Sequence, residues 1–328
     1  MNKAKLLAEI LKPGFREHEL MRDHTTIQVG GVADFYYEAN SIDDIVNAVK
    51  AAKKICLPYF ILGGGSNVIF SDYGFPGLVV KNNAKNISFM NEKSQVIVDG
   101  GVPMSKLILE ATSNNLSGLE FLYGIPGTVG GAVYGNAGAH GQSIGDFVKN
   151  ATILIPGEEN EEPQIIQVDN KWFEFSYRSS KLKKIPGLKK PVVLTLKIQL
   201  AQNRQEEIMR RLNSVKKTRW DTQPVGMSAG CIFKNPLPET LVNVSGRGSK
   251  NMPEFPKERT AGYMLDHAGA KKLKNGNVRV SSKHANFIVN SGNAKAQEVR
   301  QLAEQMRDVV QKKYNVNLNE EVEYVGQW

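Results

Sequence analysis

Two glycine-dense runs constrain the fold of this 328-residue chain more than any other feature. The first run, Gly63-Gly64-Gly65-Ser66-Asn67, lies between apolar segments at 59–62 and 68–70 that are typical of short buried strands. Residues without side chains allow backbone N–H groups to converge on a phosphate oxygen, and Ser66 and Asn67 add side-chain donors. A plain turn is the alternative interpretation. The run lacks the GxGxxG pattern that opens a helix in a Rossmann dinucleotide site, which argues against that fold.

The second run extends from Gly124 to Gly138 and is rich in glycine and alanine. It consists of Gly124-Ile125-Pro126-Gly127-Thr128-Val129-Gly130-Gly131-Ala132 and, after two residues, Gly135-Asn136-Ala137-Gly138. Such small residues let a backbone approach a large flat ligand closely and offer amides to its phosphates and ring edges. Tight packing between strands is the better explanation of this run taken alone. Taken with the first run, it favours a dinucleotide that the two runs bracket from opposite sides.

Helices and strands alternate along the first part of the chain. Ser41 is a typical N-cap for a helix over 41–54, whose apolar residues share one face, and a second helix is predicted over 104–114. Further strands are predicted at 77–81, 94–99 and 151–155. This alternation favours an α+β domain.

The chemistry of the predicted surface changes near Gln202, and we place a domain boundary there. A basic amphipathic helix follows over 205–219, with Ile208, Leu212 and Val215 on its apolar face. Beyond it, strands are predicted at 278–280 and 286–290 and a long helix at 294–314. We therefore expect one domain at 1–203, with two lobes at about 1–85 and 86–203, and a second domain at 204–328.

Composition limits the possible partners and the compartment. The formal charge of +9, from 42 basic and 33 acidic residues, favours anionic partners such as nucleotides or nucleic acid without choosing among them. Cys56 and Cys231 are the only cysteines, too few for a disulfide framework, so a reducing cytoplasm is the expected location. The five histidines show no metal-ligand pairing, so no bound metal is expected. No run approaches the ~20 apolar residues of a membrane span.

Further blocks along the chain carry a resemblance to a known family. They are Thr25-Thr26-Ile27-Gln28-Val29-Gly30-Gly31, Tyr177-Arg178-Ser179-Ser180, Ser228-Ala229-Gly230-Cys231-Ile232-Phe233-Lys234-Asn235-Pro236, Ala261-Gly262 with Ala268-Gly269, and Val280-Ser281-Ser282-Lys283-His284-Ala285. With the two glycine runs, and in this order, these blocks resemble the UDP-N-acetylenolpyruvoylglucosamine reductase family over nearly the whole chain. The resemblance is to members that lack an extra tyrosine loop.

The resemblance, and not the periodicity, implies the fold class and the reaction. The fold would be α+β, with a two-lobed FAD-binding domain of the PCMH (vanillyl-alcohol-oxidase-like) type followed by a smaller α+β substrate-binding domain. FAD would bind non-covalently to residues of the two runs: Gly63, Gly64, Gly65, Ser66, Asn67, Gly124, Ile125, Pro126, Gly127, Thr128, Gly130, Gly131, Ala132, Asn136, Ala137 and Gly138. NADPH would be the co-substrate for reducing a UDP-sugar, UDP-N-acetylglucosamine enolpyruvate, to UDP-N-acetylmuramate in peptidoglycan synthesis. A monomer without nucleic acid or membrane partners is expected.

Three residues match the catalytic positions of the family. Arg178 matches its catalytic arginine, whose guanidinium fork suits both oxygens of a developing carboxylate enolate. Glu321 matches the acid of its terminal segment, although Glu320 stands where members commonly carry proline. Cys231 stands where many members place serine as the proton donor; a thiol, with a reference pKa near 8.5, can perform the same protonation but is open to oxidation when ionised. Outside this context, a surface arginine, an exposed tail glutamate and a structural cysteine are the plainer interpretations.

Five residues are expected to contact substrate. Asn235 would bind the uracil or a nearby sugar, Lys217 and Arg219 would meet the diphosphate, and His284 matches a substrate contact of the family. Tyr177 would donate its hydroxyl to substrate or pack beside Arg178. A satisfied surface histidine is the alternative for His284.

An insertion at 237–258 departs from shorter family members, and we expect it to cover the nucleotide end of the substrate. Two other functions fit parts of the pattern. A flavin oxidase of the same wider FAD-binding class would share the cofactor half, and a nucleotide- or RNA-binding protein without catalysis would share the positive charge. Neither explains Arg178, Cys231 and Glu321 together.

Overall fold

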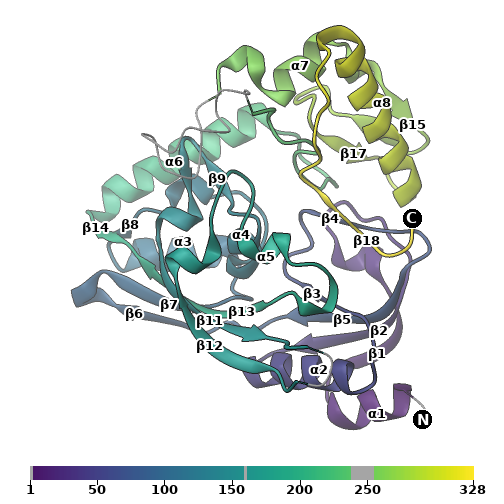
Figure 1. Cartoon of the computed structure of the whole chain (residues 1–328). Coiled ribbons are helices and arrows are strands. Elements are labelled where there is room, and N and C mark those ends of the chain that lie inside the picture. Colours follow the sequence, from purple (N-terminus) through teal and green to yellow (C-terminus); the bar gives the residue numbers. More distant parts are fainter. Residues whose placement is uncertain (1–2, 159–160, 238–254) are drawn as a thin grey trace.

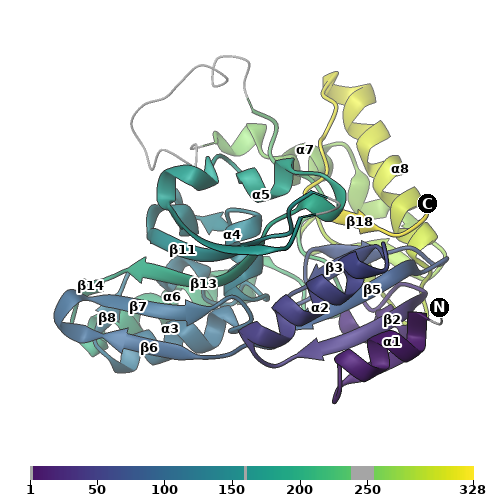
Figure 2. The same ribbon diagram turned by 60° about the horizontal axis from the view of Figure 1, so that its bottom comes forward.

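The computed structural model of the chain describes residues 3–158, 161–237 and 255–328. Two β-sheets lie next to each other, and a smaller group of helices and strands stands on the other side of the molecule, around α7 and α8 (Figures 1 and 2). This division gives three packing units, each with its own apolar cluster. The site lies where the three units meet.

The first sheet belongs to the predicted first lobe and has the strand order β1-β2-β5-β3. β1 pairs antiparallel with β2, whereas β2 and β3 both pair in parallel with β5. The predicted helix over 41–54 is confirmed as α2, with Ile45 and Val49 fully buried and a capping box between Ser41 and Asp44. The elements of this unit are α1 Lys3–Ile10, β1 Phe15–Leu20, β2 Val32–Ala39, α2 Ile42–Lys54, β3 Tyr59–Leu62 and β5 Phe75–Asn82.

The second sheet has the order β12-β11-β13-β7-β6, and each neighbouring pair is antiparallel. Its elements are β6 Ile87–Met90, β7 Gln95–Asp99, α3 Met104–Ser113, α4 Val129–Tyr134, β11 Val148–Ile155, β12 Gln164–Asp169, β13 Val192–Gln199 and α6 Gln205–Thr222. Ile208 and Leu212 of α6 are buried in the same cluster as Leu107 of α3 and Leu196 of β13. Burying side chains of this size contributes about 1.5–3 kcal/mol each. The helix α6 is therefore anchored on this sheet.

The third unit contains α7 Ala261–His267, β15 Lys274–Asn275, β16 Val278–Val280, β17 Ile288–Asn290 and α8 Ala296–Tyr314. The apolar face predicted for α8 is confirmed, because Val299, Leu302 and Met306 are fully buried. The helix begins at Ala296 and not at 294. The reason is Asp72, 224 residues before Ala296, whose carboxylate accepts hydrogen bonds from the amides of Ala296 at 2.8 Å and of Gln297 at 2.9 Å.

Three further predicted strands have different bounds in the structure. The strands predicted at 77–81 and 151–155 extend to the full lengths of β5 and β11. The strand predicted at 286–290 is shorter, because β17 begins at Ile288. Asn286 binds the backbone of Phe233 instead: its side chain accepts a hydrogen bond from the amide of Phe233 at 3.0 Å and donates one to the carbonyl of Phe233 at 2.8 Å.

The C-terminal strand returns to the first lobe. β18 Glu323–Val325 pairs in parallel with β4 Val68–Phe70, with Glu323 opposite Val68. In Figure 1 the yellow end of the chain runs from α8 down to β4. Because β4 directly follows the first glycine run, this pairing brings the terminal acidic segment to that run.

The remaining elements are short. They are α5 Lys181–Lys184 and two strand pairs, β8 Leu116–Ser117 with β14 Ala201–Gln202 and β9 Gly138–Ala139 with β10 Gln142–Ser143. Among the described residues, no helix is long and apolar enough to cross a bilayer. In the same residues, no three His, Cys, Asp or Glu side chains are grouped as metal ligands.

Candidate active site

A cavity of about 1060 Å³ lies between the two glycine runs, the third unit and the C-terminal segment. Its volume is at the upper end of the range of about 300–1,000 Å³ that ligand sites commonly have. Arg178, Cys231 and Glu321 all line it. So do both glycine runs, apart from Val129 and Asn136. Three side chains that are far apart in the sequence therefore open into one space.

The two glycine runs are in direct contact. A Cβ atom on Gly64 would lie 2.7 Å from Cα of Gly127, and one on Gly63 would lie 2.5 Å from Oγ1 of Thr128. The hydroxyl of Ser66 also donates to the carbonyl of Pro126 at 2.8 Å. Gly64 leaves no room for a side chain because the backbone of Gly127 is too close, and at Gly63 the Thr128 hydroxyl would have to move.

The first run also offers free donors to the cavity. In the described part of the chain, the amides of Gly64, Gly65, Ser66 and Asn67 donate to no acceptor. Consecutive backbone N–H groups of this kind form a concave site for anions. The residues present therefore fit the diphosphate of a dinucleotide such as FAD.

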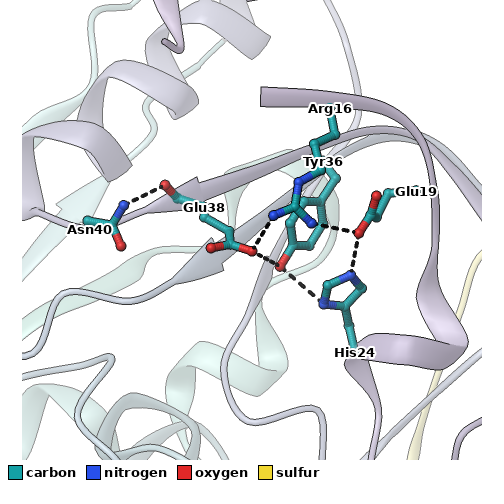
Figure 3. A network of polar contacts seen from close by, with 6 residues as sticks. All are labelled: Arg16, Glu19, His24, Tyr36, Glu38 and Asn40. Atoms are coloured by element: carbon teal, nitrogen blue, oxygen red, sulfur yellow. Dashed lines mark hydrogen bonds and ion pairs between the residues drawn. The ribbon is translucent and has the colours of Figure 1, made fainter. Parts of the chain in front are cut away.

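A polar network around His24 is shown in Figure 3, and the backbone of His24 packs against the first run. Gly65 has a φ of +65°, and a Cβ atom there would lie 2.0 Å from the carbonyl oxygen of His24. The His24 ring lies between two partners, with Nε2 at 2.9 Å from Glu19 and Nδ1 at 3.1 Å from the hydroxyl of Tyr36. Arg16 joins the network by donating to Glu19 at 2.8 Å and to Glu38 at 3.1 Å. These contacts fix the backbone against which the run packs, and no short sequence pattern indicated them.

Arg178 is held in an unusual backbone conformation. Its φ is +52°, in the left-handed region that non-glycine residues seldom occupy, and such conformations cluster at functional sites. One guanidinium nitrogen, Nη1, donates to the carbonyl of Gly138 at 2.9 Å, and Nε lies 2.7 Å from Oε1 of Glu321. Burial is the largest single effect and opposes the charge of the guanidinium, but Glu321, Tyr177 and Cys231 together outweigh it, so the pKa of Arg178 is raised. The second glycine run therefore orients a cation that stays charged.

Cys231 is a partly exposed residue whose thiol stays protonated. Burial of the sulfur, and next the charge of Glu321, raise the pKa of Cys231 to about 12, although Arg178 and Arg219 oppose the shift. The residue follows Gly230, which has a φ of +77° and only open space within 4 Å of the point where a Cβ atom would lie. At neutral pH the thiolate is scarce, which lowers the expected sensitivity of Cys231 to oxidation.

Glu321 is tied to both sides of the cavity through its backbone. Its carbonyl accepts from the side-chain amide of Asn67 at 3.0 Å, and its amide donates to the carbonyl of Ile232 at 2.7 Å. Glu320, which stands in place of the common proline, pairs instead with Arg307 at 2.8 Å and accepts from Tyr324 at 3.3 Å. The carboxylate of Glu320, which replaces the common proline, is thus paired with nearby side chains.

Arg219 lines the cavity and also fastens α6 to the second run. Its Nε donates to the carbonyl of Tyr123 at 2.9 Å, and its Nη2 donates to the carbonyl of Phe121 at 3.0 Å. A Cβ atom on Gly124 would lie 3.0 Å from Cδ of Arg219. Burial lowers the pKa of Arg219.

Four predicted residues lie outside the cavity and contact other parts of the protein. Asn136 is buried, donating to the carbonyl of Ser176 at 2.9 Å and accepting from the amide of Gly145 at 3.1 Å. Tyr177 accepts from the amide of Asn235 at 3.2 Å, and the side chain of Asn235 accepts from the amide of Ala261 at the start of α7 at 3.0 Å. Lys217 is exposed on α6. Their predicted ligand contacts stay predictions.

His284 also lies outside the cavity lining. Its Nδ1 accepts from the amide of Asn286 at 3.2 Å, so the proton is on Nε2 when the ring is neutral. Burial, and next the charge of Lys271, lower the pKa of His284. The predicted insertion at 237–258 lies for the most part outside the described residues.

The sequence interpretation missed a second polar group in the cavity. Tyr134, Lys190 and Glu323 line it and contact one another. The sequence did contain one indication of Glu323. It follows Glu321 by two residues, and this spacing places two side chains on the same face of a strand. Tyr134 and Lys190 carry no such signal.

Comparison with known proteins identifies the family. Residues 223–325 match the model of the UDP-N-acetylenolpyruvoylglucosamine reductase C-terminal domain, and residues 33–159 match an FAD binding domain. The UDP-N-acetylenolpyruvoylglucosamine reductase of Anoxybacillus flavithermus is 36% identical over 326 residues, covering 98% of this chain and 99% of that protein. The chain belongs to the UDP-N-acetylenolpyruvoylglucosamine reductase family.

Further members of this reductase family are similar to the chain in sequence and in structure. The enzyme of Bacillus subtilis is 36% identical, covering 94% of this chain and 93% of its own. The crystal structure of the reductase from Thermus caldophilus superimposes with a TM-score of 0.74 at 30% identity, over 95% of this chain and 99% of that one. The predicted fold class and FAD as the cofactor are thereby confirmed.

Proposed function

We propose that this chain reduces UDP-N-acetylglucosamine enolpyruvate with NADPH and FAD, and that Arg178, Cys231 and Glu321 carry the chemistry. The observation behind the residue roles is their position: an arginine, a protonated thiol and a carboxylate line the same cavity as the two glycine runs. Family membership supports the reaction, which belongs to peptidoglycan precursor synthesis.

The glycine runs would hold FAD, with the amides of Gly64 to Asn67 at its diphosphate. When bound, FAD would supply the hydride-transfer chemistry between NADPH and the methylene carbon of the enolpyruvyl group. The chain itself must then do two things. It must stabilise negative charge beside the substrate carboxylate, and it must deliver a proton to the carbon that bears the ether oxygen.

Arg178 meets the first need. Its guanidinium keeps its charge in a partly buried site, where a preoriented cation stabilises developing negative charge more than it does in water. The hydrogen bond from Nη1 to the carbonyl of Gly138 sets the direction of the fork, and Glu321, 2.7 Å from Nε but without hydrogen-bond geometry, stabilises its charge as an ion pair. The planar fork suits a carboxylate better than a lysine ammonium does.

Cys231 meets the second need. With a pKa of about 12, the thiol carries its proton at neutral pH and is able to give it to a strongly basic carbanion or enolate. Arg178 and Arg219 both favour the thiolate that this transfer leaves behind. The same cations that accept the substrate charge therefore assist the proton donor.

The decisive experiment separates the two half-reactions. The purified protein is reduced with NADPH without oxygen, and UDP-N-acetylglucosamine enolpyruvate is then added while the flavin absorbance is followed. We expect bleaching by NADPH and rapid return of the oxidised spectrum with substrate. Reoxidation by oxygen but not by the UDP-sugar would instead support a flavin oxidase, and a colourless protein would support a binding protein without catalysis.

The proposal also includes the oligomeric state, the compartment and the domain boundary. The enzyme acts as a monomer in the cytoplasm, and its domains divide at one end of α6, either near residue 203, as the sequence suggests, or near residue 223, where the match to the C-terminal domain begins. Limited proteolysis distinguishes the two positions. Because Ile208 and Leu212 of α6 pack on the second sheet, cleavage near residue 223 would place α6 in the first domain, and cleavage near residue 204 would place it in the second. Light scattering of the purified enzyme tests the monomer.

A further inference from the structure

Three polar side chains that the proposed chemistry does not use meet inside the cavity. The hydroxyl of Tyr134 donates to Oε1 of Glu323 at 3.0 Å. The ammonium of Lys190 lies 2.8 Å from that hydroxyl, 3.3 Å from the same carboxylate oxygen and 4.9 Å from the centre of the Tyr134 ring. Tyr134 ends α4, Lys190 precedes β13, and Glu323 begins β18, so the cluster joins the FAD-binding part to the last strand.

The strand that carries Glu323 is weakly held by its own pairing. β18 has three residues and a single neighbour, β4, to which it pairs in parallel. Parallel pairing is slightly weaker per residue than antiparallel pairing, and an isolated two-stranded unit is marginal. The pairing of β18 with β4 is therefore short, and side-chain contacts of this strand add to the hydrogen bonds that hold the Glu321 backbone to Asn67 and Ile232.

The register of β18 decides where the proposed catalytic carboxylate points. Glu321 and Glu323 line the cavity, whereas Val322 between them is buried in the cluster of the third unit. A slip of one residue turns every side chain of a strand to the other face. Such a slip would remove Glu321 from Arg178 and place Val322 in the cavity.

The cluster fixes that register through side chains. Glu323 reaches two partners that belong to the second sheet and its helices, not to β4. Lys190 and Glu323 keep 30% and 25% of their side-chain surface exposed, so their ion pair by itself contributes little to stability. The contacts instead orient the Glu323 side chain, because Tyr134 and Lys190, from separate elements, both bind its carboxylate.

We propose that Tyr134, Lys190 and Glu323 are positioning residues that hold Glu321 against Arg178 for the reduction of substrate. This inference rests on the proposed function. It assigns the cluster to the step that uses substrate and not to the step in which NADPH reduces the flavin.

The test compares both half-reactions in variants that keep FAD. Tyr134→Phe removes only the hydroxyl, and Glu323→Leu removes both contacts of the carboxylate. A displacement of about 1 Å at a reacting group lowers the reaction rate by about 100-fold. We therefore expect the reoxidation of the flavin by UDP-N-acetylglucosamine enolpyruvate to slow by about 10- to 100-fold. Flavin reduction by NADPH should stay within about twofold. Glu323→Gln, which keeps an acceptor for Tyr134, should regain most of the rate lost in Glu323→Leu.

Lys189→Met is the matched control for Lys190→Met, because Lys189 pairs with Glu158 on the exposed surface. Lys190→Met should slow reoxidation selectively and Lys189→Met should not. An equal fall in both half-reactions, loss of FAD from Tyr134→Phe, or unchanged reoxidation in Tyr134→Phe and Glu323→Leu would overturn the inference. Failure of the wild-type enzyme to reoxidise with the UDP-sugar would instead refute the proposed function.

Discussion

The two sides of the cavity are built in different ways. The cofactor side consists of the glycine runs at 63–67 and 124–138, where backbones approach so closely that side chains do not fit. The proposed catalytic side consists of Arg178, Cys231 and Glu321, which come from three distant parts of the chain and are oriented by charge and hydrogen bonding. Contiguous runs fix the shape of one side, and long-range contacts fix the chemistry of the other.

This difference predicts how each side fails. A substitution on the cofactor side creates a steric conflict and should weaken FAD binding. A substitution on the catalytic side leaves the space intact and should slow one half-reaction while FAD stays bound. Variants on each side test this division, beginning with the one of largest expected effect.

Cys231→Ala should slow reoxidation of the flavin by UDP-N-acetylglucosamine enolpyruvate by about 10²- to 10⁴-fold, the usual contribution of a positioned proton donor. Flavin reduction by NADPH should be unaffected. Cys231→Ser should retain activity, because a hydroxyl supplies a proton from the same position. Stopped-flow absorbance measures both steps, and equal reoxidation in the alanine variant would remove Cys231 from the mechanism.

Glu321→Gln and Arg178→Lys should each slow the same step by about 10²- to 10³-fold, the range seen when one stabilising group of a charged transition state is lost. Glu320→Gln is the matched control, since that neighbouring carboxylate pairs with Arg307 outside the cavity. Equal losses in Glu320→Gln and Glu321→Gln would show that the segment as a whole, and not the Glu321 carboxylate, is required.

Gly64→Ala should weaken FAD binding by about tenfold or more, because overpacking by one methyl group commonly costs about 1–3 kcal/mol. The added Cβ would lie 2.7 Å from Cα of Gly127, so the two runs would have to separate. Gly135→Ala is the steric control, with its nearest atom at 3.8 Å. FAD retention after dilution and the midpoint of thermal unfolding distinguish the two variants; equal behaviour would contradict the close-approach argument.

The smallest effect concerns pH. The pKa of Cys231 is about 12 in the folded protein and near 8.5 in an unfolded chain, so the protonated thiol favours the folded state. This contribution is complete below about pH 8.5 and is lost as the pH rises from there toward 12, by up to about 1.4 kcal/mol per pH unit. Denaturant unfolding between pH 8 and 10 should therefore show a steeper decline for the wild type than for Cys231→Ser. Parallel curves would argue against a buried, neutral thiol.

The local structure of the glycine-rich side of the cavity could largely be predicted from the sequence, and the side with Arg178, Cys231 and Glu321 could not. Gly63 to Asn67 and the helix after Ser41 are contiguous patterns whose physical meaning is local. The roles given to Arg178, Cys231 and Glu321 came from a family resemblance, because no spacing rule brings residues so far apart together. The cap that Asp72 places on α8 was invisible for the same reason.

The pairing of β18 with β4 also orders events during synthesis of the protein. Although both lobes precede α6 in the chain, β4 has only β18 as a strand neighbour among the described residues, and Ile27, Val29 and Ile69 pack in the apolar cluster of the third unit. The carboxylate beside Arg178 arrives only with the segment next to β18. The cavity is therefore completed late: a chain released before this segment is made lacks both the strand partner of β4 and the carboxylate beside Arg178.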